Sequence, residues 1–209
     1  MKKLLVIALM ALFTLGTHAQ IVSSRSTGIT KVSKPSNSWN TLSFEYLPST
    51  LSMDGSSESF TGLALNFTHA TSISNSTPLF IEFGLGAQYS TYDKNHLSFN
   101  VVSAKVPLNI VYDFAIPNST ISLDPYVGLK FRFNAWGKAE YSYNGRKTSI
   151  DLFDSNEGNW KRFQAGMRLG VKARFNNTFF VGIGYGFDFN EIGDNAKVNE
   201  VQLSVGLCF

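Results

Sequence analysis

Apolar and polar residues alternate strictly along the last twelve residues of the chain. In the segment VNEVQLSVGLCF (198–209), an apolar residue stands at every odd position from 201 to 209, and polar or small residues stand between them. Alternate residues of a β-strand point to opposite faces. The segment therefore predicts a strand with one apolar face and one polar face.

The same alternation recurs seven times upstream, with Gly, Asn, Ser and Pro between the segments, as is typical of turns. In the fourth segment the apolar residues change parity: Phe99 and Val101 would face outward only if a β-bulge lay near Val101 and Val102. The eight predicted strands are 39–48, 60–71, 78–92, 97–114, 121–136, 160–175, 179–190 and 198–209.

Charged residues fall on only one face of these strands. A Lys or Arg facing hydrocarbon costs about 2–4 kcal/mol, so the segregation favours an all-β, eight-stranded antiparallel up-and-down transmembrane β-barrel with a polar interior. A soluble barrel of the lipocalin kind would have the reverse arrangement, but the apolar set is too bulky for so narrow an interior. The thirteen inward charged residues are Glu45, Glu82, Lys105, Asp113, Asp124, Lys130, Arg132, Arg162, Arg168, Lys172, Arg174, Asp188 and Glu200.

Six of these residues are acidic and seven are basic, so they can pair inside the barrel, where an unpaired charge is costly. We expect an outer cluster of Arg162 with Asp188 and Glu200. The alternative is a set of scattered pairs bridged by water. The expected periplasmic cluster is Asp113, Asp124 and Arg174, and the lumen charge network also includes Glu82, Lys130, Arg132, Arg168 and Lys172.

Connections between the predicted strands alternate in length. The second, fourth and sixth are short, whereas residues 49–59 and 137–159 form longer loops. Short turns are periplasmic in bacterial barrels, so both termini are expected in the periplasm. Asn144-Gly145 indicates a small hairpin beyond the outer rim. Aromatic residues at strand ends are predicted to form an interfacial girdle; they include Trp39, Tyr92, Trp136 and Trp160.

The N-terminus has the pattern of a secretory signal peptide. Lys2 and Lys3 precede an apolar run over 4–15 that is too short to span a bilayer, and Ala19 suits cleavage. We expect a signal peptide over 1–19, a flexible periplasmic lead-in over 20–38 and a barrel over 39–209. Loss of the two lysines lowers the formal net charge from +3 to +1, so nothing in the charge favours nucleic acid as a partner.

Candidate catalytic and metal-binding residues are few. His69 is predicted on the outer face near the periplasmic interface, and His96 in a solvated outer loop. His96 with Asp93 and Ser98 could form a hydrolase site at the outer rim. Loop carboxylates could hold Ca²⁺ but match no known loop signature; they are Asp54, Asp151, Asp154 and Glu157. We therefore expect no enzyme, cofactor or metal.

Two strands carry a family resemblance. The segments VPLNIVYDF (106–114) and DPYVGLKFRF (124–133) resemble paired strands of the small outer-membrane β-barrel, porin-like family, which includes PorT-like proteins and eight-stranded barrels of the OmpX type. The resemblance implies an eight-stranded outer-membrane barrel with a signal peptide and without catalytic residues. The long loop 137–159 departs from the family's pattern.

These observations favour a non-enzymatic integral protein of a Gram-negative outer membrane that presents extracellular loops for surface interaction or envelope structure. The alternatives are an accessory barrel of a secretion machine and a hydrolase at the rim that uses His96. Expected partners are outer-membrane lipid, a surface or periplasmic partner, and the barrel-assembly machinery. Val205, Leu207 and Phe209 are the expected assembly signal.

Overall fold

A computed structural model of the chain describes residues 37–53, 56–74, 76–94, 96–143, 146–156, 158–193 and 195–209. The predicted signal peptide and all but two residues of the predicted lead-in lie outside these ranges. The strands are β1 (Ser38–Met53), β2 (Ser56–Ser72), β3 (Leu79–Lys94), β4 (Leu97–Tyr112), β5 (Phe114–Ala115), β6 (Ile121–Tyr143), β7 (Arg146–Asp151), β8 (Phe163–Phe175), β9 (Phe179–Asp188) and β10 (Lys197–Cys208).

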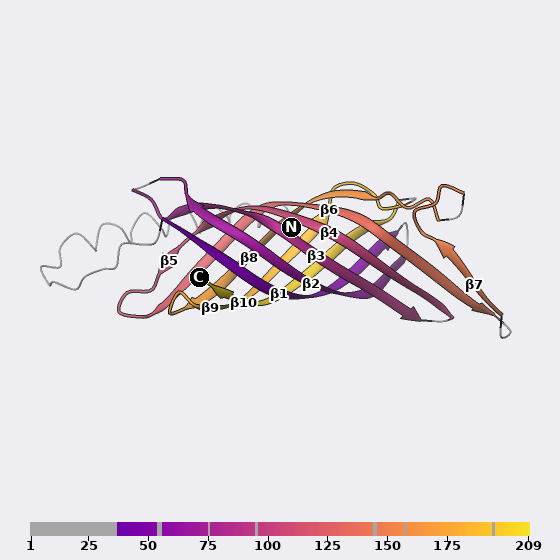
Figure 1. The fold of residues 1–209 in the computed structure, drawn as a ribbon, viewed down its shortest axis with the longest axis horizontal. Helices are drawn as coiled ribbons and strands as arrows, with labels where there is room; N and C mark the ends of the chain where they lie inside the picture. The colour runs from indigo at the N-terminus through magenta and orange to yellow at the C-terminus, as the bar shows by residue number, and fades with distance from the viewer. Residues whose placement is uncertain are drawn as a thin grey trace, which may run out of the picture. The chain divides into compact units, whose positions relative to one another are not determined.

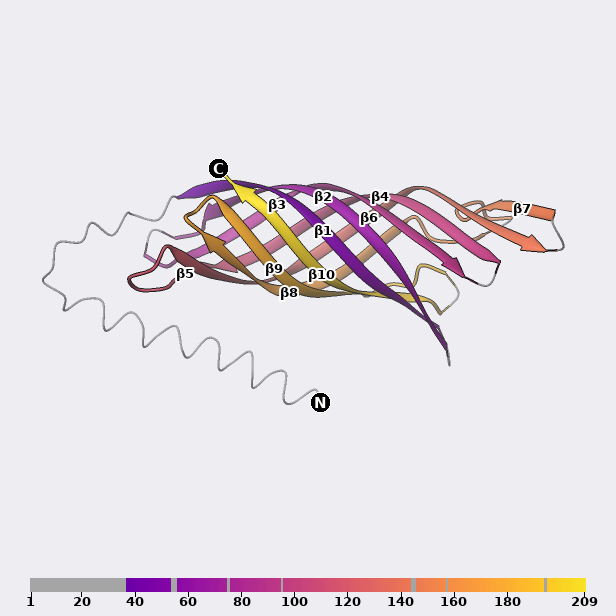
Figure 2. The same cartoon turned by 90° about the horizontal axis from the view of Figure 1, so that it is seen from below.

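Eight of these strands close into a ring, which confirms the predicted fold class. Each strand pairs antiparallel with its neighbours in the order β1-β2-β3-β4-β6-β8-β9-β10. β10 then pairs with β1, with Leu42 opposite Leu207, and closes the barrel (Figures 1 and 2). The short strands β5 and β7 each pair with β6 outside this ring. Within the described residues, no helix is long and apolar enough to cross a membrane.

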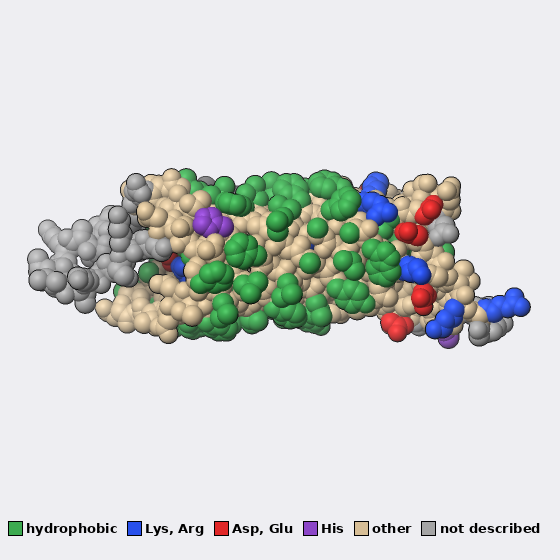
Figure 3. All heavy atoms as spheres, in the orientation of Figure 1, with side chains coloured by type: hydrophobic (Ala, Val, Ile, Leu, Met, Phe, Trp, Pro, Cys, Tyr) green, Lys and Arg blue, Asp and Glu red, His purple; other side chains and the backbone are tan. Residues whose placement is uncertain are grey.

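The two faces of the barrel wall have opposite chemistry. Leu65 and Leu85 on the outer face are 59% and 68% exposed, whereas Glu82 and Glu200 on the inner face are 2% and 1% exposed. Figure 3 shows hydrophobic side chains in a belt across the visible face of the barrel, with most of the visible charged side chains gathered beyond one edge of it. The apolar set therefore faces outward, and the alternative with an apolar interior is wrong.

The two rims of the barrel differ in construction. The terminus end, where β1 begins and β10 ends, has the connections 73–78, 113–120 and 176–178. The opposite rim, called the loop end below, has the connections between β1 and β2, between β3 and β4, between β6 and β8, and between β9 and β10. β6 and β7 project beyond the other strands at the loop end (Figure 1).

Two predicted loops at the loop end are largely strand. Residues 49–59 belong mostly to β1 and β2, which pair as far as Met53 opposite Ser56. β6 continues to Tyr143 and forms a hairpin with β7 from Lys138 opposite Asp151. These segments lie on the loop-end side of the apolar belt, where both faces of a strand can be polar. They lack the alternation that identifies a half-buried strand.

The β-bulge is on a different strand from the predicted one. Phe99 and Val101 point inward, with 9% and 4% of their surface exposed, so β4 keeps one parity throughout. The register instead shifts opposite Val102 and Ser103, where Ala135 is the extra residue of β6. Because an apolar cluster fills the lumen at this level, an inward apolar residue there does not mark a change of face.

Candidate functional site

At the terminus end, the lumen contains the predicted periplasmic cluster. The Arg174 guanidinium contacts Asp113 Oδ2 at 2.9 Å and Asp124 Oδ2 at 3.1 Å. It also lies over the Trp39 ring, 4.4 Å from the ring centroid. β6 and β8 carry Asp124 and Arg174 on their inner faces, and Asp113 follows β4 directly. One arginine therefore holds two carboxylates together at this rim.

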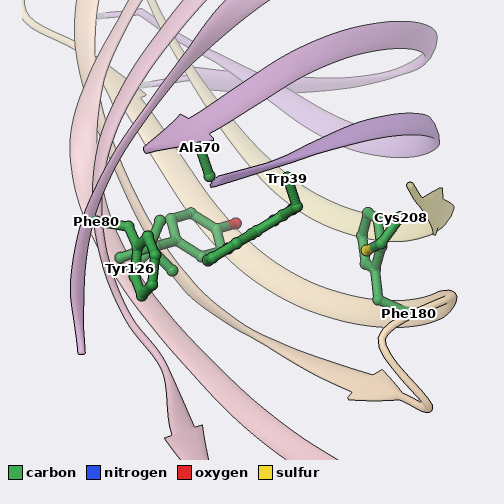
Figure 4. Close-up of a cluster of buried hydrophobic side chains, with 7 residues drawn as sticks. Trp39, Ala70, Phe80, Tyr126, Phe180 and Cys208 are labelled. Carbon is green, nitrogen blue, oxygen red and sulfur yellow. The ribbon is translucent and has the colours of Figure 1, made fainter. Parts of the chain in front are cut away.

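An apolar cluster lies beside this ion-pair group and contacts it through Trp39. It consists of Trp39, Ala70, Phe80, Val111, Tyr126, Phe180 and Cys208, all buried in the lumen (Figure 4). Trp39 and Phe80 are in ring contact, with centroids 4.4 Å apart. The predicted position of Trp39 in an outward girdle is therefore wrong. Trp39 shares its parity in the sequence with Glu45, and that parity identifies the inner face.

The middle of the lumen has two further groups of ion pairs. Glu45 contacts Lys105 at 2.9 Å and Arg168 at 3.2 Å. Glu82 contacts Lys172 at 2.6 Å. These contacts cross the lumen between strands far apart in the chain, so they link opposite walls of the barrel.

Nearer the loop end, Lys130 lies between two carboxylates, 3.0 Å from Asp188 and 3.1 Å from Glu200. Arg132 contacts Asp188 at 2.7 Å. Arg162 does not join them, which corrects the predicted outer cluster. Its guanidinium donates to the carbonyl oxygen of Ala135 at 2.9 Å. β8 begins only at Phe163, so Arg162 belongs to the loop before it.

Without Arg162, six acidic and six basic side chains of the described residues form direct ion pairs in the lumen. Neutral amide side chains pair among them; Asn109, for example, donates to Glu82 at 2.8 Å. The alternation of the strands predicts which charges point inward, but not these cross-lumen partners. The cavity among these groups measures about 10 Å³, so the middle of the lumen is filled with side chains rather than open as a wide channel.

Aromatic rings pack against one another inside the lumen at the loop end. Phe99 lies at the centre, with ring centroids 5.6 Å from Phe60, 5.2 Å from Tyr92 and 5.6 Å from Trp160. The predicted girdle positions of Tyr92 and Trp160 are therefore wrong, whereas Trp136 is 46% exposed on the outer face. Trp160 precedes β8 in an irregular segment, where strand parity gives no signal.

A cavity of about 340 Å³ lies beside this aromatic cluster. Leu51, Phe60, Leu97, Phe99 and Trp160 contribute apolar walls, and Glu58 contributes a carboxylate. Tyr92 donates its hydroxyl hydrogen bond to Glu58 at 3.2 Å, and Lys94 contacts the same carboxylate at 3.5 Å. Sequence reasoning missed this cavity because residues 49–59 are predicted as a loop rather than as the strands that form its wall.

The two histidines lie apart from each other. His69 contacts Asn40 Oδ1 through Nδ1 at 2.9 Å and packs against Phe83, near the terminus end. His96 is exposed at the loop end with φ of 66°, while Asp93 and Ser98 face each other across β3 and β4. In the described part of the chain, the His96 ring makes no hydrogen bond to either residue. The three residues therefore do not form a catalytic triad in this structure.

Of the candidate calcium residues, the structure describes Asp151 and Asp154, which lie in one turn where the backbone N–H of Asp154 donates to the carbonyl oxygen of Asp151 at 3.4 Å. Asp151 accepts a hydrogen bond from the backbone of Phe153, and Asp154 accepts one from the backbone of Asn156, each at 2.8 Å. Asp54 and Glu157 lie outside the described residues. Among those that are described, no three His, Cys, Asp or Glu side chains are grouped to hold a metal ion.

The predicted assembly-signal residues lie together on the outer face of the closing strand. Val205, Leu207 and Phe209 are all exposed. Phe209 is also in ring contact with Phe67 of β2, with centroids 6.4 Å apart. They thus form an apolar strip beside the seam between β10 and β1, and their recognition during assembly stays a prediction.

Comparison with known proteins gives a family and a set of similar folds. The family described as outer membrane protein beta-barrel domain matches residues 5–209. The structure is similar to Ail, the attachment invasion locus protein of Yersinia pestis (17% identity, 83% of this chain and 100% of that chain, TM-score 0.46). It is similar to Neisserial surface protein A, with 16% identity over 83% of this chain and 98% of that chain and a TM-score of 0.49. It is also similar to the outer membrane enzyme PagL, with 13% identity over 79% of this chain and 97% of that chain and a TM-score of 0.49. No curated protein matches the sequence.

Proposed function

Since this chain belongs to the outer membrane protein beta-barrel domain family, we propose that it is a non-enzymatic barrel that presents its loop end for interactions at the cell surface. The family places the barrel in a bacterial outer membrane, with lipid around the apolar belt. The proposal adds a direction and a role: both termini lie in the periplasm, and the loop end faces outward.

The observation that carries the proposal is the projecting hairpin of β6 and β7. Its residues Lys138–Tyr143 and Arg146–Asp151 pair with each other past the last β6–β8 pair, Phe133 opposite Phe163, while β6 also remains paired with β4 as far as Tyr141. All described residues of β7 are exposed, so the hairpin has polar surface to offer to a partner. At the terminus end, the connections are short and carry one charged residue, Asp113, which is bound to Arg174. This asymmetry supports a presenting role for the loop end.

The filled lumen favours the presentation of the loop end over the transport of a solute through the barrel. Six acidic and six basic side chains form ion pairs in the described lumen, and those of Glu45 and Glu82 link opposite walls, so a solute would have to break several buried ion pairs to pass. Removing one partner of such a pair costs about 3–5 kcal/mol. A hydrolase at the rim has weaker support, because His96, Asp93 and Ser98 are not hydrogen-bonded to one another.

Orientation is tested with single cysteines. In a Cys208→Ser background, Ser149→Cys places a thiol on β7 and Ser119→Cys places one on a terminus-end connection; both serines are exposed. On intact cells, a membrane-impermeant maleimide should label the Ser149→Cys variant and should label the Ser119→Cys variant only after the envelope is permeabilised. The opposite labelling would reverse the proposed orientation.

The role is tested by shortening the hairpin. Replacing residues 142–147 with Asn-Gly leaves Tyr141 and Thr148 opposite each other in a two-residue turn. Cells with this variant should lose binding to an array of immobilised glycans and matrix proteins, while the barrel still shows heat-modifiable migration on SDS gels. Unchanged binding together with a changed profile of secreted proteins would favour the secretion accessory instead.

The hydrolase alternative is tested separately. His96→Ala should leave the binding of cells to the array and their lipid profile unchanged. Lys94→Ala is the control. If His96→Ala changes the lipid profile and Lys94→Ala does not, the result would favour a hydrolase site at the rim.

A further inference from the structure

The loop-end cavity has the size and lining of a small-molecule site. Its volume of about 340 Å³ falls within the range of roughly 300–1,000 Å³ that is typical of ligand pockets. Leu51, Phe60, Leu97, Phe99 and Trp160 line it. Binding an apolar group there would remove its surface from water, which favours association. The body of a ligand should therefore be aryl or short alkyl.

Glu58 sets the charge of the ligand. It is the one charged residue among the described residues that line the cavity. Its side chain is 43% exposed, and its salt bridge to Lys94 spans 3.5 Å between two largely solvated groups. Such an exposed pair is weak, so the carboxylate is available to a competing cation.

The aromatic rings around Glu58 favour the same sign of charge. Tyr92 donates to Glu58 and stacks on Phe99, while Phe60 and Trp160 contact the other sides of Phe99. Aromatic faces attract ammonium groups through the quadrupole of the ring. An anionic head would meet the carboxylate and the negative ring faces, and would be repelled by both.

Apolar surface continues from the cavity along the barrel wall. Leu97 lines the cavity and lies opposite Tyr141 of β6, and both side chains are exposed. A flexible apolar chain can follow this surface while its head remains at Glu58. From this geometry we propose that the loop-end cavity binds a cationic amphiphile, that is, an ammonium group on an aryl or short alkyl body. This site does not depend on the proposed orientation or on the hairpin's role, because the purified barrel contains it.

Three probes that share a phenyl ring on a short alkyl chain and differ in the charge of the head group test the ligand class: 4-phenylbutyl-trimethylammonium, 4-phenylbutanol and 4-phenylbutyrate. The chain has three tryptophans, so Trp39→Phe with Trp136→Phe leaves Trp160 as the reporter beside the cavity. In non-ionic detergent, the cation should change Trp160 fluorescence and bind at least about tenfold more tightly than the carboxylate, with the alcohol between them. Titration calorimetry on the unmodified barrel gives the same order independently of the tryptophan changes.

Glu58 variants test the proposed contact. Glu58→Gln should weaken binding of the cation about three- to fivefold and leave the alcohol unchanged. Glu58→Lys should reverse the preference between cation and carboxylate. Glu140→Lys, an exposed β6 residue outside the cavity lining, is the matched control and should keep the original preference.

Equal affinity for the three probes, an unresponsive Trp160, or an effect of Glu140→Lys as large as that of Glu58→Lys would overturn the proposal. Heat-modifiable migration checks that each variant is folded. Since all measurements use purified barrel, failure here leaves the presenting role of the loop end untouched, and failure of the cell-binding test leaves this site untouched.

Discussion

The two ends of the barrel are built from the same strands but differ in what they do with charge. At the terminus end, Arg174 is buried with Asp113 and Asp124, and Trp39 and Phe80 pack beside it. At the loop end, charged side chains lie mostly in the exposed hairpin and the connections, and an apolar cavity remains beside Phe99. One end is closed by contacts within the lumen, while the other keeps surface for outside molecules.

The difference follows from how far the strands extend at each end of the barrel. At the terminus end, the strands end at the level of Asp113, Asp124 and Arg174, which point into the lumen and pair with one another. At the loop end, β4, β6 and β7 continue beyond the belt into a region where side chains can remain in water. The same alternation of residues therefore gives a packed lumen at one end and a partly open, exposed surface at the other.

The largest contrast should come from one substitution made at both ends. Arg174→Met leaves the buried Asp124 and the partly buried Asp113 without their partner and should lower the free energy of unfolding by about 3–5 kcal/mol. Arg162→Met removes an exposed arginine that donates to backbone carbonyls and should cost less than about 1 kcal/mol. Urea unfolding in lipid vesicles, followed by tryptophan fluorescence, measures both. Similar losses would mean that the two ends do not differ in this way.

This contrast also marks what the sequence can predict. Strict alternation predicts the eight strands and the inner face, because hydrocarbon admits only apolar side chains on the outer face. It places Asp113, Asp124 and Arg174 inside together, since all three lie near one rim. It fails for Arg162 and Trp160, which precede β8 in an irregular segment.

The loop end was harder to predict because water replaces lipid there. Residues 49–53 and 56–59 are rich in Ser and contain one buried apolar side chain, Leu51, so neither the strands nor the cavity they line leaves a clear periodic signal. The alternation places Phe99 and Val101 on the wrong face for a related reason: an apolar cluster inside the lumen contains the same residue types as a lipid-facing surface.

A second pair of substitutions compares the apolar belt with the outer face at the loop end. Leu65→Arg places a charge in the apolar belt and should destabilise the barrel by about 2–4 kcal/mol. Ser98 lies on the same outer face at the loop end, opposite Asp93. Ser98→Arg should change the free energy of unfolding by less than about 0.5 kcal/mol. Unfolding in vesicles measures both values. A small effect at Leu65 would contradict the assignment of this face to lipid.

Shortening the hairpin should separate stability from presentation. Replacing residues 142–147 with Asn-Gly removes pairs that lie beyond the ring, such as Ser142 opposite Lys147. The expected loss in unfolding free energy is below about 1 kcal/mol, because edge pairs exposed to water on both faces contribute little. A loss as large as that of Arg174→Met would show that the hairpin helps to hold the barrel closed.

The smallest effect on stability concerns Lys94, and it links the rim to the cavity. Its side chain is 60% exposed and contacts Glu58 at 3.5 Å, so Lys94→Gln should lower the unfolding free energy by no more than about 0.5 kcal/mol. The same change frees the Glu58 carboxylate from its cationic neighbour, so the 4-phenylbutyl-trimethylammonium probe should bind more tightly although the barrel is no more stable. Lys147→Gln, on the exposed strand β7, should leave both quantities unchanged. If Lys94→Gln weakens binding of the cation, Lys94 supports the site rather than competing for it, and Glu58 is not the group that receives the ammonium.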